Sequence, residues 1–167
     1  MIKKRIVISG GGSGGHIYPG IAIAQALEKQ DPSIEIHFVG ARRGMEAQII
    51  PKAGYPLHCL RVGRLNKNVS KIERIITLIT LPIAFLQCLL LLIKLRPKYV
   101  LGVGGFASGP FLLIASLCGF KTAIWEPNAF PGLANRLLAP FVRRAFVVFK
   151  ESAEFFSSEK EIGRAHV

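Results

Sequence analysis

The stretch Arg5-Ile-Val-Ile-Ser-Gly-Gly-Gly-Ser-Gly-Gly-His16 decides the fold class of this chain. Its first half is a short, continuous apolar run, which is typical of a buried parallel strand. Its second half is a glycine-rich turn, and the absence of Cβ atoms lets backbone N–H groups approach a ligand closely. When a helix follows such a turn, its N-terminus adds a positive potential that suits phosphate. The stretch therefore predicts a strand, turn and helix arranged to bind an anion.

A second stretch of the same kind lies later in the chain, where Tyr99-Val-Leu101 leads into Gly102-Val-Gly-Gly-Phe-Ala-Ser-Gly-Pro110. One glycine-rich turn alone is a weak signal. Two such turns in one domain, each after a short apolar run, suggest that a diphosphate is held between them.

Short apolar runs alternate with helical patterns along the whole chain. Strands are expected at Arg5–Ser9, Ile34–Val39, Tyr99–Val103, Thr122–Trp125 and Ala145–Phe149, with a weaker candidate at Leu57–Val62. Helices are expected at Pro19–Lys29, Gly44–Ala53, Ile72–Leu95, Ser108–Leu117 and Gly132–Leu138. This alternation predicts an α/β fold, a doubly wound, Rossmann-like parallel sheet with helices on both faces.

The composition indicates a folded domain with an anionic partner. The 167 residues are half hydrophobic and 19% charged, which suits a single globular domain with a sizeable core. The net charge of +12 is unevenly placed, since ten residues between Lys52 and Lys121 are Lys or Arg and only Glu73 is acidic. This asymmetry favours a membrane surface or a phosphorylated substrate over a merely solvated basic face. Nucleic acid is disfavoured, because the basic residues flank an apolar segment rather than aromatic side chains that could stack on bases.

The cysteines and the N-terminus indicate a cytosolic protein. Cys59, Cys88 and Cys118 are odd in number and widely spaced, which predicts reduced core residues rather than disulfides. Their spacing from histidines does not match a metal site. The basic residues at the start lead into an apolar run that is too short for a secretory signal.

The segment from Ile75 to Ile93 has nineteen consecutive uncharged residues, a length that permits a transmembrane helix. Pro82 interrupts it, and a spanning helix would put the two glycine turns on opposite sides of a membrane. We therefore expect a crossover helix or helix pair on the sheet. Its surplus apolarity suits shallow insertion into an anionic bilayer, and a plain core helix is the alternative. The basic residues around it are Lys67, Lys71, Arg74, Lys94, Arg96 and Lys98.

The first turn also fits the G-x-G-x-x-G pattern of dinucleotide sites through Gly10, Gly12 and Gly15. Two features count against such a site. The second strand ends in Val39-Gly40-Ala41-Arg42-Arg43, without the acidic residue that would bind a ribose, and Pro19 suggests that the helix starts late. An NAD(P)-binding oxidoreductase remains the less favoured alternative, in which Arg42 could tolerate a 2′-phosphate.

Polar residues next to the predicted strand ends could act on a substrate. His16 directly follows the first turn and could serve as a general base or as a donor to phosphate. The alternative is that it only caps or packs the turn. Glu126-Pro-Asn128 follows the Thr122–Trp125 strand at the edge where open α/β sheets bind ligands, although Pro127 and Asn128 could simply form a turn.

Four motifs, in this order, resemble the MurG family of glycosyltransferases. They are Gly-Gly-Gly-Ser-Gly-Gly-His-Ile-Tyr-Pro-Gly (10–20), Arg-Gly-Met-Glu-Ala (43–47), Gly-Val-Gly-Gly-Phe-Ala-Ser-Gly-Pro (102–110) and Glu-Pro-Asn-Ala-Phe-Pro-Gly-Leu-Ala-Asn-Arg (126–136). Together they reach from the start of the chain to about Lys150, and the combination is highly specific. Members of this family are peripheral membrane enzymes that add N-acetylglucosamine to an undecaprenyl-diphosphate-linked muramyl-pentapeptide.

The resemblance implies the N-terminal half of a two-domain GT-B glycosyltransferase, with residues 1–160 as the acceptor-binding domain and the C-terminal donor-binding domain absent. It implies UDP-N-acetylglucosamine and the lipid-linked muramyl-pentapeptide as substrates, no cofactor or metal, and a peripheral place on the cytoplasmic face of the bacterial inner membrane. His16 is the first candidate for the catalytic base and Glu126 is the second. The residues expected to bind substrate are Ser13, Gly14, Gly15 and Asn128 toward the donor, with Gly104, Gly105 and Ser108 in the turn that holds the acceptor diphosphate.

Two features depart from the family pattern. Pro127 stands where the family has a glutamine, which removes that amide here. Residues 161–167 continue no earlier pattern, and the last six match one reading frame of a common sequencing adapter, so we expect a non-native tail and leave it out of the fold prediction. An ordinary frayed C-terminus is the alternative. A natural end after Phe149 would instead fit a second alternative, in which the chain is the acceptor-binding subunit of a split lipid-linked sugar transferase.

Overall fold

The computed structural model describes residues 4–42, 44–62, 70–156 and 161–164, in which strands and helices alternate as predicted. The strands are β1 (Lys4–Gly10), β2 (Ile34–Ala41), β3 (Leu57–Leu60), β4 (Tyr99–Gly104), β5 (Lys121–Glu126), β6 (Arg144–Val147) and β7 (Glu161–Arg164). The helices are α1 (Gly14–Gln30), α2 (Glu46–Lys52), α3 (Lys71–Leu95), α4 (Ser108–Leu117), α5 (Leu133–Leu138) and α6 (Lys150–Ala153). The short helix α6 and the strand β7 were not predicted.

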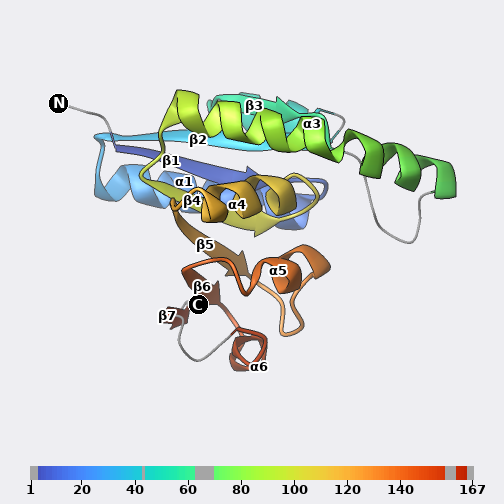
Figure 1. Ribbon diagram of the computed structural model, residues 1–167. Coiled ribbons are helices and arrows are strands. Elements are labelled where there is room, and N and C mark those ends of the chain that lie inside the picture. The colour runs from blue at the N-terminus through green and yellow to red at the C-terminus, as the bar shows by residue number, and fades with distance from the viewer. Residues whose placement is uncertain (1–3, 43, 63–69, 157–160, 165–167) are drawn as a thin grey trace.

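The seven strands form one parallel sheet in the order β3-β2-β1-β4-β5-β6-β7 (Figure 1). The chain first winds outward from β1 to β3, then crosses back through α3 to β4 and winds the other way. This confirms the predicted doubly wound, Rossmann-like fold. The turns after β1 and β4 leave the carboxyl edge on the two sides of the switch point, where open α/β sheets bind ligands.

Two apolar clusters cover the two faces of the sheet. Successive residues of a strand point to opposite faces, so Val7 belongs to one cluster and Ile8 to the other. The cluster with Ile8 includes Ile17 of α1 and Ile50 of α2. The cluster with Val7 is formed with residues of α3, α4 and α5, and its central side chains are Cys88, Leu92, Phe111, Leu112 and Leu138.

Helix α1 begins earlier than predicted. It starts at Gly14, directly after the first glycine turn, and Pro19 lies inside it. The prediction of a late start was wrong, because it assumed that the proline marks the first turn, whereas Pro19 is the sixth residue of α1 and the helix accommodates it there. The start of α1 therefore gives no argument against a dinucleotide site. The remaining argument is the end of β2, where the acidic residue that would bind a ribose is missing.

The apolar segment forms one continuous helix, α3, rather than a helix pair, and Pro82 lies within it. A stripe of buried side chains that includes Ala84, Cys88 and Leu92 packs against the rest of the domain. The N-terminal half of α3 extends past the carboxyl edge of the sheet (Figure 1). By length and composition Ile75–Leu95 could cross a membrane, with 22% of its most apolar window buried, which by itself is weak evidence for a span.

Residues Glu161–Arg164 of the expected tail pair in parallel with β6 as strand β7, with Arg144 opposite Glu161 and Val147 opposite Arg164. The non-native origin of the tail stays a prediction, while these four residues form the strand at the edge of the sheet. Pairing at a sheet edge uses backbone N–H and C=O groups, which every sequence supplies. Residues 165–167 lie outside the described residues.

The cysteine prediction holds in part. All three cysteines are free, and Cys88 is buried in the core. Cys59 and Cys118 are exposed, so their prediction as core residues was wrong. The first lies in β3, which ends the sheet on that side, and the second follows the last turn of α4, where the chain leaves the core.

Candidate functional site

The two glycine-rich turns lie side by side because β1 and β4 are neighbours in the sheet. The N–H of Gly11 donates to the carbonyl oxygen of Gly104 over 3.2 Å. Gly104 and Gly105 have φ values of +99° and +90°, a region that favours glycine. A Cβ atom on Gly105 would also overlap the backbone of Gly11. The glycines are thus needed for the close approach of the two turns.

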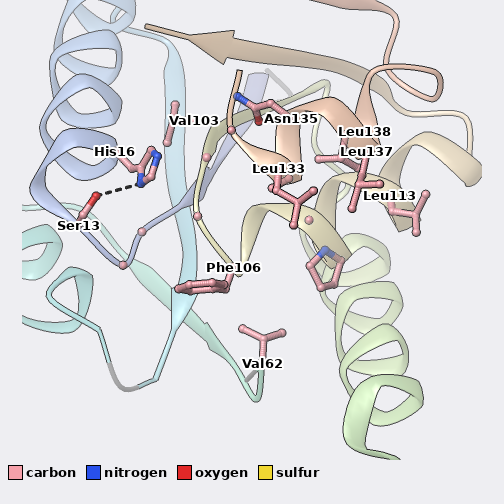
Figure 2. A pocket seen from close by; sticks show the side chains of 18 of the residues that line it. Ser13, His16, Val62, Val103, Phe106, Leu113, Leu133, Asn135, Leu137 and Leu138 are labelled. Atoms are coloured by element: carbon pink, nitrogen blue, oxygen red, sulfur yellow. Dashed lines mark hydrogen bonds between the residues drawn. The ribbon is translucent and has the colours of Figure 1, made fainter. Parts of the chain in front are cut away.

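His16 lies in the first turn of α1 and packs against the second glycine turn. Its Nδ1 atom is 3.1 Å from the hydroxyl oxygen of Ser13, as the dashed line in Figure 2 shows. A Cβ atom on Gly104 would be 2.7 Å from its Nε2 atom. The hydrogen bond to Ser13 therefore fixes the ring orientation and leaves Nε2 on the side of the second turn.

Glu126 is 1% exposed and its carboxylate organises the loop after β5. Oε1 accepts hydrogen bonds from the backbone N–H and the side-chain amide of Asn128, at 3.0 and 2.9 Å. Oε2 accepts from the N–H of Gly132 at 3.1 Å and from the amide of Asn135 at 2.9 Å. Four donors satisfy both oxygens, which leaves this carboxylate poorly placed to take a proton from a substrate. Its role as second candidate base stays a prediction, and the geometry favours His16.

A cavity of about 770 Å³ joins these parts (Figure 2). Its polar side consists of the two glycine turns together with His16 and Asn128. Its apolar side lies between α3, α4 and α5, and in Figure 2 Leu113, Leu133, Leu137 and Leu138 gather there. The site can therefore hold a ligand that has a phosphate next to an apolar chain.

The structure brings most of the predicted site residues together. Ser13, His16, Gly104, Gly105, Glu126 and Asn128 line the cavity. Gly14 and Gly15 lie in the first turn of α1 but do not line it, and Ser108 is fully buried beside Gly102 at the start of α4. Direct contact by these three residues stays a prediction, and burial of the Ser108 hydroxyl disfavours it.

One buried acid near the turns was missed. Glu46 is 1% exposed, and its carboxylate accepts hydrogen bonds from the N–H groups of Gly12 and Ala41, both at 2.9 Å. Because Ala41 ends β2, this carboxylate lies where a dinucleotide site would need an acid for the ribose. Its two oxygens are already bound to the backbone, so it does not supply that function. The site thus lacks the ribose-binding part of a dinucleotide site within the described residues.

The described part of the chain contains no group of three or more His, Cys, Asp or Glu side chains that could hold a metal ion.

Fold and site together define a doubly wound α/β domain whose two glycine-rich turns and cavity lie at the carboxyl edge of its sheet. The glycosyltransferase family 28 N-terminal domain matches residues 6–147, and the chain belongs to this family.

Curated relatives support this assignment. The chain is 56% identical over 161 residues to a protein from Bdellovibrio bacteriovorus named UDP-N-acetylglucosamine--N-acetylmuramyl-(pentapeptide) pyrophosphoryl-undecaprenol N-acetylglucosamine transferase, covering 96% of this chain and 45% of that protein. A Myxococcus xanthus protein of the same name is 42% identical over 93% of this chain and 40% of its own length. The chain thus spans less than half the length of these curated relatives.

Solved structures agree with the fold. The crystal structure of Acinetobacter baumannii MurG superposes with a TM-score of 0.80 at 25% identity, over 96% of this chain and 45% of that one. A UDP-GlcNAc 2-epimerase from Neisseria meningitidis, solved with UDP-GlcNAc bound, has a TM-score of 0.64 at 14% identity and covers 96% of this chain and 45% of its own. The second likeness shows a shared fold alone.

Proposed function

We propose that this chain is the acceptor-binding half of an enzyme that transfers N-acetylglucosamine from UDP-N-acetylglucosamine to an undecaprenyl-diphosphate-linked muramyl-pentapeptide. The observation that carries the proposal is the cavity, which joins two glycine turns to an apolar space between α3, α4 and α5. The acceptor has the same two parts in sequence, a diphosphate next to a polyprenyl chain. The names of the relatives support the same substrates.

Backbone groups supply the anion site. A helix leaves the N–H groups of its first turn without intrahelical partners, and α1 begins directly at the cavity. These N–H groups and the helix dipole favour a diphosphate at this end. The second turn lies against the first, so a ligand that meets the N-terminus of α1 also meets Gly104 and Gly105.

The proposed reaction is a single displacement with inversion. The acceptor C4 hydroxyl oxygen attacks the anomeric carbon of N-acetylglucosamine, and the bond from that carbon to the UDP phosphate oxygen breaks. His16 takes the hydroxyl proton, and UDP leaves with the electron pair of the broken bond. Ser13 holds the ring of His16 in one orientation for this step. Asn128, held by Glu126, also lines the cavity and is proposed to contact the donor sugar nucleotide.

A second role for His16 follows from the same geometry. Because it packs against the second turn, it could donate a hydrogen bond to a phosphate oxygen instead of accepting a proton. The base role predicts a loss in kcat on substitution, whereas the phosphate role predicts a loss in KM that Gln partly restores.

We also propose that the domain lies on the cytoplasmic face of the bacterial inner membrane. Ten of the described large hydrophobic side chains of α3 are exposed, including Ile72, Ile79 and Leu90 at 70%, 70% and 57%. The protruding half of α3 lies at the same edge as the glycine turns (Figure 1). Shallow insertion of this face into an anionic bilayer would bring the cavity to the level of a lipid-linked diphosphate. Of the predicted basic residues around α3, Lys94 is exposed at its C-terminal end, and Lys67 lies outside the described residues.

The test is a chimera of residues 1–156 with the C-terminal part of the Bdellovibrio relative. We expect it to transfer labelled N-acetylglucosamine from UDP-N-acetylglucosamine to a short-chain analogue of the lipid acceptor, with activity that survives EDTA. The 167-residue chain alone should not catalyse transfer. An inactive but folded chimera would overturn the proposal. Thermal stabilisation of the chain by NADP, and not by a polyprenyl diphosphate, would favour the oxidoreductase alternative instead.

A further inference from the structure

Glu46 lies behind the first glycine turn rather than in the cavity. It is the first residue of α2 and is 1% exposed, although a glutamate is among the residues least often buried. It does not line the cavity. A buried carboxylate is costly unless hydrogen bonds satisfy it, so its place there needs an explanation.

The carboxylate joins two loops that are far apart in sequence. Oε2 accepts from the N–H of Gly12 in the first glycine turn, and Oε1 accepts from the N–H of Ala41 at the end of β2. Both distances are 2.9 Å, typical of a well-formed N–H···O hydrogen bond. Glu46 therefore ties the turn after β1 to the turn after β2.

Three glycines from three different segments leave room for this side chain. A Cβ atom on Gly11 or on Gly44 would overlap the carboxylate, and one on Gly40 would be 2.7 Å from the Cγ atom of Glu46. Any side chain at these positions would push the carboxylate away. The space around Glu46 is therefore built into the sequence at several points, which indicates a specific role.

The contact decides which amides of the first turn remain for a ligand. Gly11 N–H is bound to the Gly104 carbonyl and Gly12 N–H is bound to Glu46. Beyond these two occupied amides the turn continues through Ser13, which lines the cavity, into the start of α1 at Gly14, where the first N–H groups have no intrahelical partner. Gly12 has a φ of +87°, so its peptide can adopt other orientations when nothing holds it.

We propose that Glu46 is a positioning residue, which sets the first glycine turn so that the N-terminus of α1 meets the acceptor diphosphate. This inference rests on the proposed function. Glu46 itself does not touch the ligand. It acts through the Gly12 N–H, and the same carboxylate charge keeps the diphosphate from binding that amide in place of those of α1.

The test uses Glu46→Gln and Glu46→Asp in the chimera, with Glu28→Gln as the matched control. Gln has nearly the same shape, but its NH₂ group would face an N–H donor, while Asp keeps the charge and is too short to bridge both amides. Glu28 is a half-buried glutamate that likewise accepts a hydrogen bond, from the Tyr55 hydroxyl at 2.7 Å, and it lies at the far end of α1. The measured quantities are the KM for the acceptor, the inhibition constant of inorganic pyrophosphate competing with the acceptor, and the unfolding temperature.

We expect both Glu46 variants to raise the acceptor KM and the pyrophosphate inhibition constant in parallel, by about tenfold to a hundredfold, the usual effect of losing a hydrogen bond to a charged group. Glu28→Gln should lower the unfolding temperature without changing either constant. Glu46 variants that unfold at a lower temperature but keep both constants would show a purely structural role and overturn the inference. An inactive wild-type chimera would overturn the proposed function, and the inference with it.

A measurement on the unchanged 167-residue chain covers the case in which the variants fail to fold. Hydrogen exchange of the Gly12 amide should be strongly slowed, because a buried carboxylate holds it. Exchange of Gly12 as fast as that of an open loop would overturn the inference.

Discussion

The carboxylate of Glu126 holds Asn128 twice, through the backbone N–H at 3.0 Å and through the side-chain amide at 2.9 Å. Both residues line the cavity, and Glu126 is buried while Asn128 is exposed. The loop after β5 thus has the same construction as the first glycine turn, where buried Glu46 holds Gly12. In both places an internal acid orders a short loop at the carboxyl edge of the sheet.

Glu126→Gln should destabilise the domain and slow transfer without altering the pH dependence of the rate. The amide would place a donor against N–H groups that now meet an acceptor, which costs about 1 to 3 kcal/mol. Chemical denaturation and the rate of the chimera measure the two effects. Glu151→Gln, at an exposed position in α6, is the control and should change neither. A large loss of kcat with full stability and a changed pH profile would instead identify Glu126 as the base.

Gly104→Ala should abolish most of the activity, because the added Cβ would displace His16 and φ at this residue is +99°. Gly54→Ala is a matched control, since Gly54 also has a positive φ of +87° but nothing within 4 Å of an added Cβ. Both variants bear the backbone strain, so only the difference between them reports on the site. Equal turnover in the two variants would contradict the role of the second turn.

Gly14→Ala tests how close the start of α1 comes to the ligand. An added Cβ would lie 3.3 Å from the Tyr18 ring and meets no strained φ, so the fold should persist. A large rise in the acceptor or donor KM would confirm direct contact by the Gly14 backbone. Unchanged kinetic constants would remove Gly14 from the predicted substrate-binding residues.

Six of the seven strands and the meeting of the two glycine turns could be predicted from the sequence, and the misses have physical causes. Continuous apolar runs are required of strands buried on both faces, so every predicted strand is present. The glycine turns could be placed at one edge because parallel strands end together. The link between Gly12 and Glu46 could not be predicted, since it joins distant segments through backbone amides that leave no pattern of their own. The only trace of this link in the sequence is that Gly40 and Gly44 lie close to Glu46. The reason for these two glycines becomes clear from the packing, where they leave room for the Glu46 side chain.

His16→Ala should lower kcat by about 100-fold to 10,000-fold if the histidine is the general base. Ser13→Ala should cause a smaller loss, because it removes only the hydrogen bond that orients the ring. Steady-state kinetics of the chimera separates kcat from KM. A loss confined to KM, largely restored in His16→Gln, would assign the histidine to phosphate binding, and rates within a few-fold of wild type would eliminate both roles.

The exposed face of α3 should bind anionic vesicles. Ile79→Ser together with Ile83→Ser, at positions 70% and 54% exposed, should weaken binding by removing inserted apolar surface. Lys94→Gln should weaken it by about 1 kcal/mol at most and reduce its salt dependence. Leu117→Ser, at an equally exposed position on α4, is the control and should have no effect. Vesicle sedimentation measures the affinity, and protein that resists salt and carbonate and needs detergent for release would establish a span instead.

The stability of the domain should fall on mild acidification because of His58. Burial lowers the pKa of His58 from its usual 6.5, and the nearby His37 and Lys94 lower it further. The Nε2 atom of His58 is 3.1 Å from Nδ1 of His37, so protonation of one ring disfavours protonation of the other. The unfolded chain then binds more protons than the folded one as pH falls through 6.5, and the stabilisation present above that pH is progressively lost below it.

His58→Gln should flatten the change of unfolding temperature between pH 7.5 and pH 5.5, values chosen to bracket roughly the ordinary histidine pKa. Glu35, whose pKa is lowered mainly by the Arg5 hydrogen bond, should contribute only below about pH 4.5. An unfolding temperature of His58→Gln that falls with pH as steeply as that of the wild type would assign the acid sensitivity to other groups.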